Sequence, residues 1–104
     1  MWTQIIKTRV KPGKEAEIET LIGEFKSQER PNSGLVRSTT ARDQKDPNIL
    51  YMIVTFESEE KARLREQDPA RQEGLAKARE IMADIFEGPP EFVDLNVVAE
   101  HSGT

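Results

Sequence analysis

The eight residues Ile49–Phe56 form the most apolar run of the sequence, and they restrict the fold more than any other segment. A short apolar run between polar, turn-forming residues is typical of a β-strand, and here apolar side chains fall on both faces of that strand. Such a strand needs cover on both sides of its sheet. The helices of one small chain can cover only one side, so we expect a second copy of this chain to cover the other.

The remaining segments divide into strands and helices by the spacing of their apolar residues. Alternation with a period of two predicts strands over residues 2–10 and 92–98, and β-branched residues between two turns predict a strand over residues 35–42. Apolar residues at positions 18, 21, 22 and 25 share one face of a helix predicted over residues 14–29. A second helix is predicted to begin after Ser58, a typical N-cap, to break at Asp68-Pro69 and to end before Gly88.

Strand, helix, strand, strand, helix, strand is the order of a split β-α-β repeat. We therefore expect an α+β, ferredoxin-like fold (β-α-β-β-α-β), in which an antiparallel four-stranded sheet carries both helices on one face. The length of 104 residues suits a single domain. Because no linker or low-complexity segment interrupts the sequence, we expect one domain over residues 1–100 and a flexible tail over residues 101–104.

Composition argues against several classes of function. The net charge of −4 and the mixing of acidic with basic residues argue against a nucleic-acid partner, which needs clustered positive charge. The chain has no cysteine, which removes disulfides, thiolate nucleophiles and sulfur-ligated metals, and no His/Asp/Glu cluster has metal-ligand spacing. No segment has the character of a membrane span or a signal peptide, so we expect a cytoplasmic protein with no membrane partner.

Three short motifs resemble the antibiotic-biosynthesis-monooxygenase (ABM) family. They are the strand end and turn Val10-Lys-Pro-Gly-Lys14, the strand end and helix start over residues 54–62, and the helix break at Asp68-Pro69. The resemblance covers roughly residues 1–99 and implies a dimeric α+β barrel, with the homodimer formed through the sheet face. The resemblance identifies the superfamily more specifically than it identifies an activity. The three motifs are turns and helix caps, which any member needs whatever its chemistry.

The resemblance implies two kinds of activity. Members of the family include cofactor-independent monooxygenases that oxidise quinols or anthrones, and enzymes that degrade haem. The haem-degrading branch uses an Asn, a Trp and a His, which would fall at about Ile6, Arg65 and Gly74 of this sequence. None of the three is present, and the only histidine, His101, lies in the tail. Haem degradation is therefore disfavoured, and no cofactor is expected.

Four residues are candidates for contact with a small aromatic substrate: Gln4, Thr8, Tyr51 and Arg71. Gln4 and Thr8 share a strand face with Ile6, Tyr51 offers a hydroxyl for a quinol oxygen, and Arg71 follows the break at which the family's pocket opens. Each also has a structural explanation. The first two side chains could be hydrogen-bonded within the fold, Tyr51 could pack in the core, and Arg71 could lie on a solvated helix face.

Three functions from different classes remain open. The resemblance implies a cofactor-independent monooxygenase acting on a small, quinol-like aromatic. The alternatives are a non-catalytic dimeric barrel that binds a small apolar ligand, and a structural module whose pocket is filled by its own side chains. The volume and contents of the pocket help to distinguish them. An open cavity lined by polar groups favours binding or catalysis, and a pocket filled by the protein's own side chains favours the structural module.

Overall fold

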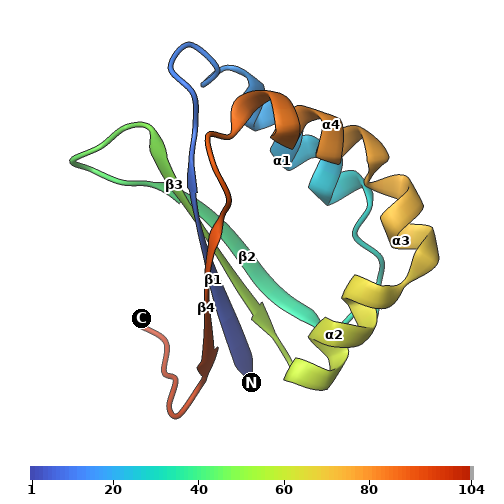
Figure 1. The fold of residues 1–104 in the computed structure, drawn as a ribbon. Coiled ribbons are helices and arrows are strands. Elements are labelled where there is room, and N and C mark those ends of the chain that lie inside the picture. Colours follow the sequence, from blue (N-terminus) through green and yellow to red (C-terminus); the bar gives the residue numbers. More distant parts are fainter. Residues whose placement is uncertain (104) are drawn as a thin grey trace.

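A computed structural model describes residues 1–103 and confirms the α+β class and the expected order of strands. All four strands pair antiparallel, in the order β2-β3-β1-β4. Figure 1 shows every helix on one side of the sheet. The elements are β1 (Trp2–Arg9), α1 (Glu17–Ser27), β2 (Leu35–Arg42), β3 (Ile49–Phe56), α2 (Glu59–Gln67), α3 (Pro69–Gly74), α4 (Ala76–Ile85) and β4 (Glu91–Asn96).

The predicted bounds of β2 and β3 are confirmed, and those of β1 and β4 differ from the structure by one or two residues. β1 ends at Arg9, and Val10 makes only an isolated bridge to Phe86. β4 was predicted to reach residue 98 but ends at Asn96. Asn96 pairs with Trp2, the first residue of β1, so β4 has no partner strand left beyond that point.

The second helical segment is divided into three helices rather than two. The expected N-cap is confirmed, since the Ser58 hydroxyl accepts a hydrogen bond from the Lys61 amide at 3.2 Å. The break at Asp68 is also confirmed: Asp68 ends α2 and caps α3, and its carboxylate accepts from the Ala70 amide at 3.0 Å. A further break at Leu75, which the sequence analysis missed, separates α3 from α4. Within residues 1–103, no helix is both long enough and apolar enough to span a membrane.

The core on the helix-covered face consists of two separate clusters. The first joins Val10, just after β1, to β3, α1 and α4, at the end of the sheet where Thr8 pairs with Leu50. Its buried members are Val10, Ile18, Leu21, Leu50, Ala78 and Ile85. The second joins β1, β3 and α2 at the opposite end; its buried members are Trp2, Phe56 and Ala62. The middle of this face, between the two clusters, is where the cavity described below lies.

The opposite face of the sheet has no helix over it (Figure 1). Register places Ile5 between Ile53 and Val93 on this face, which we call the outer face. Val93 is 50% exposed and Leu95 is 41% exposed. Such an apolar surface on three adjacent strands is unusual for an isolated soluble chain.

The residues after β4 have no regular structure as far as 103, and the predicted tail also includes Thr104, which lies outside the described residues. Glu100 forms an ion pair with Arg37 of β2, with 3.3 Å between Arg37 Nη2 and Glu100 Oε1.

Candidate functional site

A cavity of about 780 Å³ lies between the sheet and the helices, within the range of small-molecule binding sites. Its walls come from β1, β2, β3, β4 and all four helices, and most of them are apolar. The lining residues are Ile6, Thr8, Ile22, Phe25, Lys26, Glu29, Leu35, Ser38, Thr40, Met52, Val54, Arg65, Arg71, Met82, Ala83, Phe86, Gly88, Pro90 and Phe92. Three phenylalanine rings and two methionine thioethers make this wall suitable for a flat aromatic ligand.

Three hydroxyl groups line the sheet side of the cavity, on Thr8, Ser38 and Thr40. Thr8 is buried, and its hydroxyl donates a hydrogen bond to the Leu50 carbonyl oxygen at 3.3 Å. Because a hydroxyl oxygen also has lone pairs, Thr8 can still accept a hydrogen bond from a ligand O–H. The sheet therefore offers polar contacts along an otherwise apolar floor.

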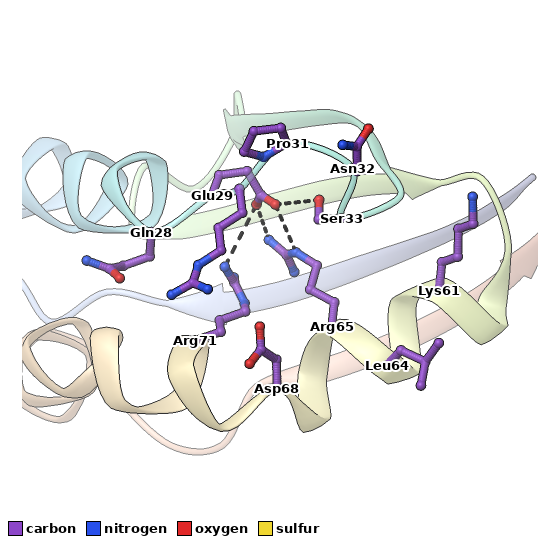
Figure 2. Close-up of a pocket in the computed structure, with 11 residues that line it drawn as sticks. Gln28, Glu29, Pro31, Asn32, Ser33, Lys61, Leu64, Arg65, Asp68 and Arg71 are labelled. Atoms are coloured by element: carbon purple, nitrogen blue, oxygen red, sulfur yellow. Dashed lines mark hydrogen bonds and ion pairs between the residues drawn. The ribbon is translucent and has the colours of Figure 1, made fainter.

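The charged end of the cavity consists of Glu29, Arg65 and Arg71. Figure 2 shows both guanidinium groups directed at the one carboxylate. Arg65 binds both oxygens of Glu29: its Nε donates to Oε2 at 3.2 Å and its Nη2 contacts Oε1. The Ser33 hydroxyl also donates to Oε2, at 2.7 Å. Arg71 is more distant, with 3.8 Å between its Nη1 and Glu29 Oε1.

The helix break brings the two arginines together. Residues six positions apart in a continuous helix point about 120° away from each other, since each residue turns the helix by about 100°. Pro69 begins α3, and Asp68 is in an extended conformation, so the chain changes direction between Arg65 and Arg71. Arg65, in the last turn of α2, and Arg71, in the short helix α3, can therefore reach the same carboxylate.

Arg71 is incompletely satisfied in this arrangement. Its side chain is only 11% exposed, and Nη1 is buried without a hydrogen-bond partner. Burial, and then repulsion from Arg65, lowers the pKa of Arg71 below its ordinary value. An arginine nevertheless stays charged at neutral pH, so the cavity wall contains a buried cation whose ion-pair partner, Glu29, it shares with Arg65.

Glu29 has little capacity left for a ligand. Burial raises its pKa, but the hydrogen bonds from Arg65 and Ser33 outweigh burial, and the net effect is a lowered pKa. Its carboxylate is therefore ionised and fully engaged. Counting Lys26, the lining has three cationic side chains against this one carboxylate, a net charge of +2 in a chain whose net charge is −4.

A smaller hollow of about 380 Å³ lies next to the charged end, between the α1–β2 connection and α2 (Figure 2). Glu29, Arg65 and Arg71 line both spaces, whereas Lys61 and Leu64 line the hollow but not the cavity. The two arginines and the glutamate thus form the charged wall shared by the apolar cavity and this outer hollow.

The model of the family described as "Antibiotic biosynthesis monooxygenase" matches residues 1–77 of the chain. That is nearly three quarters of the sequence, and it begins at the first strand and includes the helix break. The chain belongs to the antibiotic biosynthesis monooxygenase family. A search of curated proteins found no significant match.

Solved structures confirm the fold of this ABM protein. A protein described by the same family name from Chloroflexus aurantiacus is 22% identical, with a TM-score of 0.68 and coverage of 97% of this chain and 96% of that one. A variant of SnoaB, a cofactor-independent oxygenase from Streptomyces nogalater, is 16% identical, with a TM-score of 0.73 and coverage of 95% and 94%.

A variant of MhuD with two manganese protoporphyrin IX molecules bound per active site is also similar. It is 18% identical, with a TM-score of 0.80 and coverage of 99% of this chain and 100% of that one. At these identities the three likenesses establish the fold of this ABM protein and leave its chemistry open.

The positions that correspond to the haem-degrading triad do not suit haem in this ABM protein. Ile6 and Arg65 line the cavity, but neither is an iron ligand. At Gly74, an added Cβ would lie 1.9 Å from Oε1 of Gln28, so the flexible side chain of Gln28 would have to move to admit a histidine there. No histidine, cysteine or tyrosine is among the lining residues. The donor set therefore does not fit an axially ligated haem.

Two of the four candidate residues, Thr8 and Arg71, line the cavity. Gln4 lies on the same face but outside the lining, because its amide donates to Asp94 Oδ1 at 2.9 Å, and Arg63 Nη2 donates to the other oxygen of Asp94 at 3.2 Å. Tyr51 pairs with Lys7 in the register and lies on the outer face.

The sequence analysis missed several lining residues for which signals exist. Alternation along β2 places Ser38 and Thr40 on one face, so two hydroxyls at this spacing indicate a polar stripe on a sheet. Lys26, in α1, and Glu29, just after its end, continue the spacing of Ile22 and Phe25. Charged residues at positions of an apolar stripe indicate a polar site within the core.

Proposed function

We propose that this protein is a cofactor-independent monooxygenase that oxidises a small, quinol-like aromatic in the cavity, as a homodimer. The observation that carries the proposal is the cavity itself: apolar and aromatic walls, hydroxyls along the sheet and positive charge at one end. A structural module filled by its own side chains would not leave about 780 Å³ between two core clusters.

The positive end of the cavity supports the first step of such a reaction. Cofactor-free oxygenation begins when an electron-rich phenol loses its proton, because the resulting anion can pass an electron to dioxygen. A cationic, water-poor site stabilises that anion and so lowers the pKa of the phenol. Arg65 and Arg71 supply the positive charge that would stabilise an anionic oxygen at this end, and the Thr8 hydroxyl would contact a second oxygen from the sheet.

The stoichiometry requires only the substrate and dioxygen. In an anthrone, a ring CH₂ becomes C=O with one oxygen atom from O₂, and the second oxygen atom leaves as water with the two hydrogens. The substrate supplies the electrons, so the protein needs to bind, orient and stabilise charge. These are the tasks for which the lining residues are suited.

The outer face supports the homodimer. Ile5, Ile53, Val93 and Leu95 form an apolar surface, and Thr3 and Thr55 add a hydroxyl pair at 3.0 Å. A symmetric dimer would place two such surfaces against each other and bury them without a further partner. A light-scattering mass of one chain at micromolar concentration would contradict this part of the proposal.

Oxygen uptake tests the activity. The purified protein is mixed, in the presence of chelator, with a panel of hydroquinones and anthrones, and uptake is compared with autoxidation. We expect uptake above autoxidation, with one atom from ¹⁸O₂ in the product of an anthrone. Thr40→Phe, which places a ring in the cavity, should reduce the increase, and Arg37→Gln, at an exposed arginine outside the cavity, should retain it. Uptake that Thr40→Phe leaves unchanged, or no uptake with any substrate, would contradict the proposal.

One observation favours a second function, a non-catalytic dimeric barrel that binds a small apolar ligand. Glu29 is the only carboxylate of the lining, and it is occupied by Arg65 and Ser33, so the cavity has no free general base. Ligand binding without oxygen uptake in the same experiment would support this second function.

A further inference from the structure

The segment formed by α2 and α3, residues 59–74, buries very little apolar surface. Within these residues Ala62 is the only buried one, whereas α1 and α4 each bury two. Leu64, the one leucine of the segment, is 61% exposed. Packing of an apolar face supplies most of the stability of a helix in a protein. The segment, which we call the arm, is therefore attached to the core more weakly than α1 and α4.

Two arginine side chains fasten the arm to the rest of the chain. Arg63 Nη2 lies 3.2 Å from Oδ2 of Asp94 on β4, and the guanidinium carbon of Arg63 is 5.0 Å from the centroid of the Trp2 ring. Arg65 contacts both oxygens of Glu29, just after α1 (Figure 2). Charge thus holds the arm to β4 on one side and to the end of α1 on the other.

The helical backbone is interrupted at both ends of the arm. Ser58 is extended immediately before it, and Leu75 separates α3 from α4 immediately after it. Inside the arm the two helices are joined, because Nε2 of Gln72 donates to the Glu66 carbonyl oxygen at 2.8 Å. Changes in φ and ψ at a few residues between elements are sufficient to turn a packed segment. The arm therefore has a hinge at each end and an internal tie that keeps α2 and α3 together.

The position of the arm determines how large the inner space is. Glu29, Arg65 and Arg71 form the wall shared by the cavity and the outer hollow, and both arginines belong to the arm. If the arm turns outward, both arginines leave Glu29. The space of about 780 Å³ and the space of about 380 Å³ are then no longer separated by this wall.

We propose that the arm is a lid that opens as a unit while the rest of the protein stays folded. The contacts of Arg63 with Asp94 and of Arg65 with Glu29 hold it shut. When closed, it limits the site to the cavity, and when open, it extends the site into the hollow. Segments with few buried apolar contacts are the ones that open locally in folded proteins. The proposal concerns the protein alone and holds whether or not the cavity supports oxidation.

The absence of cysteine from the sequence makes thiol labelling a direct test. Ala62→Cys places a thiol under the arm and Ala78→Cys places one between α1 and α4, at alanines that are 1% and 0% exposed. Iodoacetamide reacts with a buried thiol only when the structure around it opens. We expect the full chain to be labelled about tenfold or more faster in Ala62→Cys than in Ala78→Cys, as measured by mass spectrometry. Equal rates would overturn the proposal.

Urea separates opening of the arm from unfolding of the whole chain. Opening of the arm exposes little surface, so the labelling rate of Ala62→Cys should hardly change at urea concentrations below the unfolding transition. The rate of Ala78→Cys should rise steeply, because global unfolding exposes far more surface. An equally steep rise in both variants would show that both thiols react from the unfolded chain, and the lid would be wrong even if Ala62→Cys lowers stability.

Further substitutions in Ala62→Cys test the two contacts that hold the lid shut. Asp94→Asn and Glu29→Gln each remove one carboxylate, and each should raise the labelling rate by about fivefold or more, as the loss of a charge-assisted hydrogen bond would give. Lys77→Gln is the matched control, since Lys77 Nζ pairs with Oε1 of Glu24 at 3.5 Å, between α4 and α1. It should leave the rate within about twofold. No increase with either carboxylate variant, or an equal increase with Lys77→Gln, would overturn the proposal.

Discussion

The two faces of the sheet use the same four strands for different purposes. On the inner face, helices stand away from the middle of the sheet and leave a cavity with hydroxyl and guanidinium groups. On the outer face, apolar side chains from β1, β3 and β4 lie side by side with no helix over them (Figure 1). Since successive residues of a strand point to opposite faces, one segment contributes to a ligand site and to a partner surface at once.

This difference means that single substitutions can separate the two purposes. A change on one face should alter ligand binding and leave the assembly intact, and a change one residue along the strand should do the reverse. The helix-covered face is itself uneven, because the closed end around Ile85 is fully packed and the middle is hollow. The predictions below test these contrasts in turn.

The largest effect is expected on the outer face, from Val93→Lys. Val93 is 50% exposed in the single chain, so the lysine should leave the protomer folded. In a symmetric dimer the change introduces two buried, unpaired charges, which should weaken association by about 1,000-fold or more. Sedimentation equilibrium measures the shift toward single chains. Leu64→Lys, at a residue 61% exposed on α2, is the control and should leave the dimer unchanged; equal masses for Val93→Lys and the unmodified protein would refute the assigned interface.

The next effect is on stability, at the closed end of the inner face. Ile85 is fully buried, and Ile85→Ala should cost about 2–5 kcal/mol in the free energy of unfolding, through lost burial and a new cavity. Met82→Ala should cost less, because Met82 already borders a cavity. Urea denaturation compares the two variants. A larger loss for Met82→Ala would show that the middle of the inner face is packed rather than hollow.

A paired substitution on β2 contrasts the two faces directly. Thr40 lines the cavity, and Thr39 is on the outer face, paired in register with Ile53. Thr40→Phe should lower the affinity for a naphthalene ligand by about tenfold or more and leave the dimer intact, because the ring occupies the ligand's space. Thr39→Phe should leave ligand affinity within about twofold. Calorimetry and light scattering on both variants check the pair, and identical effects on ligand affinity would contradict the assignment of faces.

The smallest expected effect is a pH dependence from the charged end of the cavity. The pKa of Glu29 in the folded chain is lowered, so its contribution to stability is fully present above the ordinary value of 4.5 and is lost as pH falls through the folded pKa. The melting temperature should therefore fall below about pH 4.5 less steeply in Glu29→Gln than in the unmodified protein. If the melting temperatures of the two proteins fall equally steeply with pH in this range, Glu29 contributes no pH-dependent stability.

The strands were predictable because their signals are local. β-branched residues between turns identified β2, and the continuous apolar run identified β3, both with their observed bounds. Asp68-Pro69 identified the helix break, since proline restricts the residue before it. The end of β4 was not predictable from its own residues. It depends on where its partner β1 begins, which is a property of the register.

The site was predictable only in part, because it depends on which face the helices cover. Thr8 and Arg71 were identified, but the sequence does not show which face of β3 lies under the helices, and Tyr51 is on the other one. Gln4 lies on the helix-covered face, but its side chain is hydrogen-bonded to Asp94. That contact depends on the pairing of β1 with β4, whose residues are more than eighty positions apart in the sequence. The convergence of Glu29 with Arg65 and Arg71 likewise arises from tertiary packing of α1 against the broken helix.

The central claim is that one face of the sheet binds a ligand and the other binds a second copy of the chain. Native mass spectrometry in the presence of 2-naphthol, a naphthalene ligand with one phenolic hydroxyl, measures both properties in one spectrum. We predict a dimer that binds up to two ligands, and for Thr40→Phe a dimer with less bound ligand. A single chain that binds the ligand, or a dimer whose ligand occupancy falls with Val93→Lys instead of Thr40→Phe, would contradict the account.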